Sequence, residues 1–332
     1  MISWSPSSLV YVVPLVSFTL AWIVLTIVIR AWADRVLDHP NERSLHQRPV
    51  SRIGGIGVAA GIAASVPFVS QMEWWPLWLA ACFLVGISFL EDIIGLPIIG
   101  RLVVHFLTAG GAAAGLLPDH TGVVLVLLAV VAIVWMTNLY NFMDGMDGLA
   151  GGMALFGFGF YAIAGVLSSH LPFAVTNAAI AAGAVAFLLF NFHPARMFMG
   201  DAGSTLLGFL AASFGLVGWQ LGIWTLWFPV LVFSPFIVDA TVTLARRLLR
   251  GEKIWRPHRE HYYQRLVLSG WGHRRTVLAE YGVMALCGGF ALLYQYASEE
   301  WQLVILGFWG VLFLSLAFAV RGGEQRIQHV GS

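Results

Sequence analysis

Apolar runs long enough to cross a lipid bilayer recur along almost the whole chain. A spanning helix needs about 20 mostly apolar residues, and about eleven such stretches can be marked. We place them near residues 9–30, 53–70, 76–90, 101–117, 122–137, 150–168, 172–190, 204–218, 222–249, 277–295 and 301–320. Of the 332 residues, 59% are hydrophobic and 11% are charged, unlike a soluble domain. We therefore predict one all-α polytopic membrane domain over residues 1–332, with about eleven transmembrane helices and ten as the alternative count.

The distribution of basic residues predicts how these helices are oriented. The connections after the odd-numbered spans contain Arg35, Arg43, Arg48 and Arg52, then Arg196, then a basic segment over residues 246–276. The alternate connections, such as "SQMEWWP", "PDHTG" and "SEEWQ", contain no lysine or arginine. Under the positive-inside rule, the N-terminus lies outside, the C-terminus is cytoplasmic, and residues 246–276 form a basic cytoplasmic loop.

The segments rich in polar side chains all fall on this predicted cytoplasmic face. They are "DHPNERSLHQRPVSRIGG", "EDIIGLPIIGR", "NLYNFMDGMDG", "NFHPARMFMGDAGS" and the basic segment 246–276. Ionisable groups at membrane depth are costly and usually mark function. Five such segments on one face indicate a single composite site.

The segment "NLYNFMDGMDGLAG" spaces Asn138, Asn141, Asp144 and Asp147 at intervals of three residues. One helix face cannot present all four, so we expect a helix that ends near Asp144, followed by a tight loop. Carboxylate and amide oxygens suit Mg²⁺ or Mn²⁺. The alternative is that these residues only cap the helix and form a turn.

A second acidic turn lies in "FMGDAGSTLLGF", with Gly200, Asp201, Gly203 and Ser204 directly before an apolar span. Such a turn offers backbone N–H groups to phosphate oxygens and a carboxylate to a metal ion. The alternative is that Asp201 or Ser204 caps the following helix. Together with the first acidic loop, this turn favours a metal–diphosphate site.

Two further groups supply acids and bases. Glu91 and Asp92 end the third span, where one of them can act as a base, or the pair can attract a metal ion or an arginine. A solvated helix end is the alternative. The histidine and arginine side chains of "PHREHYYQRL" suit a polyanion, although this histidine spacing also allows zinc.

Two more positions carry open alternatives. Asp239 lies in the ninth span, where Pro235 predicts a kink, and can line an acceptor groove, pair with an arginine, or form purely structural hydrogen bonds. Arg48 can approach a nucleotide or simply favour the inner membrane surface.

The motifs "NLYNFMDGMDGLAGG", "FMGDAGS" and "HREHYYQRL" together resemble the polyprenyl-phosphate N-acetylhexosamine-1-phosphate transferase superfamily, also called the glycosyltransferase 4 family. "DHPNERSLHQRPVSRIGGIGV" is most similar to its O-antigen-initiating branch. The likeness covers roughly residues 34 to 266. In that family the acidic pair is two aspartates, so Glu91 is a departure, and the continuous histidine triad of the peptidoglycan enzyme is absent here.

The resemblance implies roles for individual residues. It gives Asn141 and Asp201 as the magnesium ligands, and places Asp147 and Phe198 at a nucleotide pocket. We therefore predict Glu91, Asp92, Asp144 and Asp201 as catalytic residues, and Asn138, Asp147, Phe198, Arg48, Arg256, His258, Arg259 and His261 as substrate-binding residues.

The implied reaction is Mg²⁺-dependent, with Mn²⁺ as a substitute. It transfers a GlcNAc, QuiNAc or FucNAc type of sugar 1-phosphate from a UDP-sugar to undecaprenyl phosphate and releases UMP. This step would initiate O-antigen synthesis at the bacterial inner membrane. The implied partners are the UDP-N-acetyl sugar, undecaprenyl phosphate and the bilayer, with no nucleic acid and a homodimer as a further expectation. The alternative function is a secondary transporter of an anionic or nucleotide-sugar substrate, for which polar residues should lie near the bilayer midplane.

Overall fold

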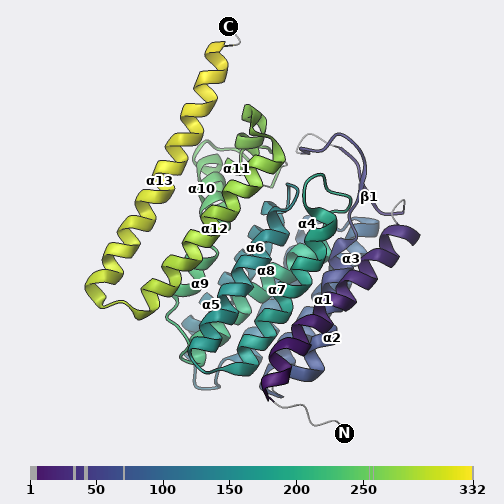
Figure 1. Cartoon of the computed structure of the whole chain (residues 1–332), viewed down its shortest axis with the longest axis vertical. Helices are drawn as coiled ribbons and strands as arrows, with labels where there is room; N and C mark the ends of the chain where they lie inside the picture. Colours follow the sequence, from purple (N-terminus) through teal and green to yellow (C-terminus); the bar gives the residue numbers. More distant parts are fainter. Residues whose placement is uncertain are drawn as a thin grey trace.

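The computed structural model describes residues 6–32, 35–40, 44–69, 72–253, 255–256 and 258–330. Arg43, one of the arginines used to predict orientation, lies outside these residues. The described part of the chain is mostly helical (Figure 1). Its helices are α1 (Pro6–Ala31), α2 (Gly54–Val69), α3 (Trp75–Ile94), α4 (Ile98–Leu116), α5 (Val123–Met143), α6 (Leu149–Leu167), α7 (Leu171–Asn191), α8 (Asp201–Gln220), α9 (Trp227–Val232), α10 (Ser234–Leu249), α11 (Tyr262–Leu266), α12 (Gly272–Tyr296) and α13 (Glu299–Val330). Short strands β1 (Leu37–Asp38) and β2 (Val50–Ser51) pair antiparallel, and single turns η1 (Met72–Trp74) and η2 (Val267–Trp271) complete the elements.

The helix lengths confirm an all-α polytopic membrane protein. Within the described residues, nine helices are long and apolar enough to cross a bilayer, and α2, with 16 residues, is a shorter apolar helix. The predicted span 222–249 is not one helix, because it divides at Phe233 into α9 and α10. Pro235 lies in the first turn of α10, where a proline is tolerated because its missing N–H has no helical partner. The count of eleven, the orientation and the homodimer stay predictions.

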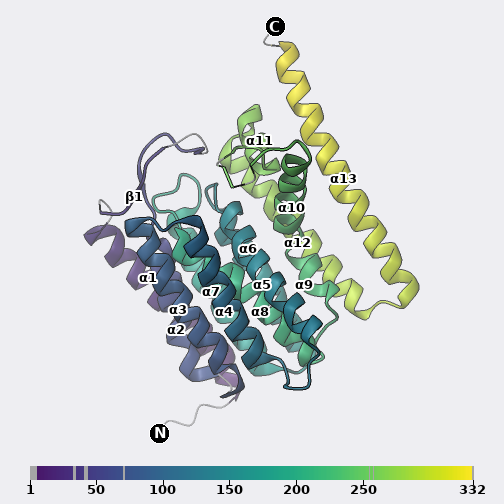
Figure 2. The same cartoon turned by 180° about the vertical axis from the view of Figure 1, so that it is seen from behind.

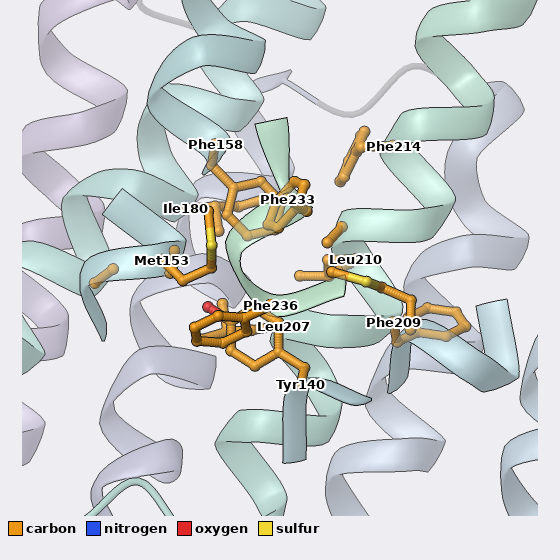
Figure 3. Close-up of a cluster of buried hydrophobic side chains, with 14 of the residues drawn as sticks. Tyr140, Met153, Phe158, Ile180, Leu207, Phe209, Leu210, Phe214, Phe233 and Phe236 are labelled. Atoms are coloured by element: carbon orange, nitrogen blue, oxygen red, sulfur yellow. The ribbon is translucent and has the colours of Figure 1, made fainter. Parts of the chain in front are cut away.

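The centre of the bundle is α8, whose apolar stretch is 89% buried. It packs against α2, α3 and α5. Aromatic side chains fill the surrounding core, among them Tyr140, Phe158, Phe209, Phe214 and Phe233 (Figure 3). Burying such large apolar side chains against one another excludes lipid from the middle of the bundle and fixes α8 in place.

The first turns of α2 and α8 touch through their backbones. A Cβ on Gly55 would lie 2.2 Å from the backbone nitrogen of Gly203, so neither position has room for a side chain. Nearby, Gly54 N donates to Phe198 O at 2.9 Å, and Phe198 N donates to Ser51 O at 2.7 Å. These contacts fix the segment before α8 against the β1–β2 pair.

One end of the bundle carries the non-membrane elements. The β1 strand and α11 lie at the upper end in Figure 1, opposite the start of α1. The segment 246–276, predicted as a loop, is largely helical there, because it holds the end of α10, all of α11 and η2, and the start of α12. The last helix, α13, lies at the edge of the molecule in both views, and its apolar stretch is only 6% buried (Figures 1 and 2).

Candidate active site

A cavity of about 200 Å³ opens where the polar segments meet. Segments far apart in the sequence supply its walls: residues 38, 44–46 and 52, the end of α3, the start of α4, the end of α5, the start of α8, the connection from α10 to α11, and α11. Its lining includes the predicted site residues Asp92, Asn141, Asp144, Phe198, Asp201, Arg256, His258 and His261. All five polar segments therefore contribute to the lining of one cavity.

Asn141 and Asp201 lie side by side in this cavity. The Asn141 amide donates from Nδ2 to Asp201 Oδ1 at 2.8 Å and to Ser204 Oγ at 2.9 Å. The pair forms because α5 ends at Met143, just after Asn141, while α8 begins at Asp201. The predicted helix end near Asp144 is confirmed, and the two predicted metal ligands are close enough to share one ion.

Asp92 holds the start of α8. Its Oδ1 accepts a hydrogen bond from Asp201 N and its Oδ2 accepts one from Ala202 N, both at 3.1 Å. The residue before the helix, Gly200, has a φ of +74°, and a Cβ there would lie 2.9 Å from Asp92 Oδ2. The alternative that Asp201 or Ser204 caps this helix is wrong, since the carboxylate that caps it comes from α3. Asp92 therefore positions Asp201.

Glu91 pairs with an arginine that we had not predicted as a site residue. Arg101, in the first turn of α4, lies 2.6 Å from Glu91 Oε1 and 3.6 Å from Asp201 Oδ2, measured from its Nη1. Glu91 and Asp92 are both buried, so the alternative of a solvated helix end is wrong. The sequence contained a signal for this pair, because Arg101 is the only basic residue in "EDIIGLPIIGR". Its positive charge offsets the crowding of three carboxylates.

Arg256, His258 and His261 form a basic wall of the cavity. Asp239 from α10 holds this wall in place. Asp239 Oδ1 lies 3.1 Å from His261 Nδ1 and accepts a hydrogen bond from Tyr262 N at 2.9 Å, while Oδ2 accepts one from Tyr263 N at 3.2 Å. These bonds fix the first turn of α11 and turn His261 toward the cavity. Asp239 therefore forms structural hydrogen bonds, and it also lines a second, larger cavity of about 920 Å³ beside α12 and α13, as the groove alternative requires.

His258 lies beside His261 in the same wall, with ring centroids 4.9 Å apart. Burial, followed by the nearby positive charges of His261 and Arg247, lowers the pKa of His258 to about 4. Its ring is therefore neutral near pH 7 and can donate or accept a hydrogen bond without adding charge.

This pKa predicts an acid-sensitive contribution to stability. Between about pH 6.5 and pH 4 the unfolded chain binds a proton at His258 that the folded chain does not, so the free energy of unfolding should rise with pH across this window. We expect the melting temperature of the detergent-purified protein to fall less steeply on acidification in His258→Gln than in the original sequence. His120→Gln, at an exposed position, is the control. Parallel curves for all three proteins would contradict the assignment.

The remaining predicted residues do not line this cavity. Asn138 turns back to its own helix, donating from Nδ2 to Val134 O at 2.7 Å. Arg48 and Arg259 are exposed. Asp147 is buried and its carboxylate is engaged by His193 and by the backbone of Ala195. Their predicted roles in substrate binding stay predictions.

Known proteins are similar to this chain over most of its length. Residues 74–219 match the family model described as Glycosyl transferase family 4. The chain is 30% identical to the undecaprenyl-phosphate alpha-N-acetylglucosaminyl 1-phosphate transferase of Haemophilus influenzae, over 90% of this chain and 91% of the relative. It is 27% identical to a probable undecaprenyl-phosphate N-acetylglucosaminyl 1-phosphate transferase of Bacillus subtilis, over 94% and 92% of the two chains. It is also 30% identical to the decaprenyl-phosphate N-acetylglucosaminephosphotransferase of Mycobacterium leprae, over 73% of each.

Proposed function

Because this chain belongs to glycosyl transferase family 4, the polyprenyl-phosphate hexosamine-1-phosphate transferases, we propose that it transfers N-acetylglucosamine 1-phosphate from UDP-N-acetylglucosamine to undecaprenyl phosphate. The chain is a multi-pass membrane enzyme, a sugar phosphotransferase. The observation that carries the proposal is the shared cavity. Its acidic wall contains Asn141, Asp144 and Asp201, and its basic wall contains Arg256, His258 and His261.

The acidic wall fits a magnesium ion. The side chains of Asn141, Asp144 and Asp201 offer hard oxygen donors, and a magnesium ion is commonly held by one or two carboxylates together with substrate phosphates. The 2.8 Å contact runs from Asn141 Nδ2 to Asp201 Oδ1, so a rotation of the Asn141 amide that exchanges Nδ2 for Oδ1 would bring oxygens of both residues within reach of one ion. We propose these two as its ligands, with Mn²⁺ as a substitute. Such an ion would neutralise charge on a bound diphosphate.

The reaction proposed is a direct transfer between two phosphates. A nonbridging oxygen of the lipid phosphate forms a bond to the β-phosphorus of the UDP-sugar. The bond from that phosphorus to the oxygen shared with the α-phosphorus breaks, and UMP leaves with this oxygen. A phosphate monoester is already largely ionised near neutral pH, so the attacking group needs no strong base.

The hydrogen bonds of Asp92 favour direct transfer over an aspartyl-phosphate intermediate at that residue. Both of its oxygens accept backbone N–H groups of α8, so its carboxylate is committed to holding the helix start rather than free to attack phosphorus. Catalysis then depends on positioning and on charge, as is usual for phosphoryl transfer. We propose that Arg256 and His261 bind the phosphate oxygens and that neutral His258 supports them by hydrogen bonding.

The test is UMP release by the purified protein with undecaprenyl phosphate and UDP-N-acetylglucosamine. A panel that adds the UDP derivatives of N-acetylquinovosamine and N-acetylfucosamine decides which sugar is preferred. We further propose that the reaction initiates O-antigen synthesis at the bacterial inner membrane. Sugar-nucleotide uptake into proteoliposomes without UMP release would instead support the transporter alternative.

Removal of divalent ions provides a further prediction. We expect EDTA to stop UMP release, because the charge of the diphosphate would be left without its counter-ion between Asp201 and the basic wall. Added Mg²⁺ should restore the rate and Mn²⁺ should restore part of it. Full activity in excess EDTA would contradict the magnesium proposal, while the melting temperature measured in parallel shows whether the protein stays folded.

A further inference from the structure

Four charged side chains form an ion-pair cluster where α10 ends. They are Arg247 in the last turn of α10, Arg250 directly after that helix, Glu252 two residues further on, and Glu260 shortly before α11. Each glutamate contacts both arginines. Among the described residues that line the cavity, none belongs to this cluster. The cluster instead lies at the two ends of the connection that supplies the basic wall.

The chain turns back on itself directly after α10. Gly251 has a φ of +72°, and its N–H donates to Leu248 O at 2.9 Å. Glu252 N donates to Arg247 O at 3.0 Å, which completes the pair of hydrogen bonds that ends many helices. This turn brings Glu252 Oε2 to 2.9 Å from Arg247 Nη1 and Oε1 to 2.7 Å from Arg250 Nε. Glu252 therefore pairs only with its own end of the connection.

Glu260 reaches the same arginines from the other end of the connection. Its Oε1 accepts a hydrogen bond from Arg247 Nη1, and its Oε2 accepts one from Arg250 Nη2. Burial opposes the charge of Glu260, but the hydrogen bond from Arg250 and the positive charge of Arg247 outweigh it and lower the pKa of this carboxyl group. Glu260 is therefore ionised near neutral pH, and its carboxylate closes the connection.

One buried face of α10 holds both parts of this closed segment. Asp239, Thr243 and Arg247 are all buried and follow one another at intervals of four residues, so they lie on the same side of the helix. Asp239 holds residues 261–263, and Arg247 holds Glu260. The Arg247 side chain is only 8% exposed, and a buried charge is costly unless it is paired. The pairing of Arg247 is therefore tightly constrained.

From these contacts we propose that Arg247 and Glu260 are positioning residues of the transferase, whose ion pair closes the connection from α10 to α11 and holds Arg256 and His258 in the basic wall. Glu260 N lies 3.4 Å from His258 Nδ1, so a displacement of Glu260 would also displace the His258 ring. This role rests on the proposed function, because the wall would bind the diphosphate of the UDP-sugar. Neither positioning residue needs to touch the substrate.

Two glutamate variants provide a matched comparison of UMP release. The Glu252 and Glu260 side chains are 36% and 37% exposed and contact the same arginines, but only Glu260 spans the connection. We expect Glu260→Ala to lower kcat/KM for UDP-N-acetylglucosamine about tenfold, mainly through KM, since the wall would bind the diphosphate before and during transfer. Glu252→Ala should stay within about twofold of the original protein, because it removes only a local pair.

The Glu260→Ala protein should still fold, because Glu252 continues to pair with Arg247 at 2.9 Å. Glu260→Asp keeps the negative charge on a shorter side chain and should recover part of the activity that Glu260→Ala loses.

The protonation of His258, followed by NMR of ¹³C-labelled histidine in the detergent-purified protein, provides a second readout. Burial, followed by the charges of His261 and Arg247, lowers the pKa of His258 to about 4, and the charges of Glu260 and Asp239 act in the opposite direction. If the connection stays closed in Glu260→Ala, the lost negative charge lowers this pKa further and the ring is neutral at pH 5. If the connection opens, the loss of burial raises the pKa toward its ordinary value of about 6.5. His258→Gln identifies the signal.

We expect His258 to take up a proton between pH 7 and pH 5 in Glu260→Ala but not in Glu252→Ala. The proposal is overturned if His258 stays neutral at pH 5 in Glu260→Ala, or if the two glutamate variants release UMP with the same kcat/KM. An original protein that releases no UMP would refute the proposed function, whereas the NMR titration would still decide whether the ion pair positions His258.

Discussion

Replacing Asp201 by alanine should lower kcat for UMP release by about 10²–10³-fold, the range seen when a single group that stabilises transition-state charge is removed. The Asp201 carboxylate is where the site's contacts converge: Asn141 donates to it at 2.8 Å and Arg101 lies 3.6 Å away. Alanine keeps the backbone N–H that Asp92 accepts, so α8 should still begin at this residue. The loss should therefore appear in the rate rather than in the fold.

Two further variants should be measured beside Asp201→Ala. Asp144→Ala, in the same cavity, should also abolish most of the UMP release. Asp119→Ala removes an exposed carboxylate from the connection between α4 and α5 and should leave the rate unchanged. The measurement is steady-state UMP release, with the melting temperature as the check on folding. An Asp201→Ala protein that turns over within about threefold of the original rate would rule out this carboxylate as a metal ligand and with it the proposed site.

Much of the fold was predictable because it follows from composition and run length. Apolar runs of helical length gave the positions of most helices, since a bilayer requires the backbone to satisfy its own hydrogen bonds. The break between α9 and α10 was only partly predictable. Pro235 predicted a kink but not the division into two helices at Phe233, whose ring packs against Phe158 and Tyr161 in the core.

Much of the membership of the cavity was predictable from the motifs, although Arg101 was missed and Asn138, Arg48, Asp147 and Arg259 do not line it. The role of each residue was not predictable. Asn141 and Asp201 were predicted as a pair and are in contact. In contrast, Asp92 was predicted as a catalytic residue and caps a helix that begins 109 positions later. The hydrogen bonds from the Asp201 and Ala202 N–H groups to Asp92 depend on how α3 is rotated against α8. The spacing of residues within a motif does not predict that rotation. The same holds for Arg101, whose contacts with Glu91 and Asp201 depend on the start of α4.

The role of Asp239 was likewise not predictable from the sequence. Its replacement is the second change for which we expect a large loss of activity. From the sequence alone, a functional role, in an acceptor groove or beside an arginine, and a purely structural role were about equally open. Its contacts with His261 and with two backbone N–H groups of α11 make it a positioning residue for the basic wall. These contacts join α10 to a segment more than 20 residues further along the chain, so periodicity within the span could not reveal them.

Replacing Asp239 by alanine should reduce kcat/KM for the UDP-sugar by about 10–100-fold. The change leaves the buried N–H of Tyr263 and the partly buried N–H of Tyr262 without an acceptor, and a buried unpaired group costs about 1–3 kcal/mol. It also frees His261 to leave the cavity. Asp239→Asn keeps one acceptor oxygen and should recover part of the activity. Thr243→Val removes only a 3.2 Å hydrogen bond to Asp239 Oδ1 and should have little effect.

A double-mutant cycle separates positioning from a general loss of stability. If Asp239 acts through His261, then His261→Ala should lower kcat/KM strongly in the original protein but only slightly in Asp239→Ala. The two changes would in that case share one energetic effect, because the ring that Asp239 orients has already been lost. Strictly additive effects, together with an unchanged affinity for UMP, would show that Asp239 only stabilises α11 and that His261 holds its place in the cavity by other contacts.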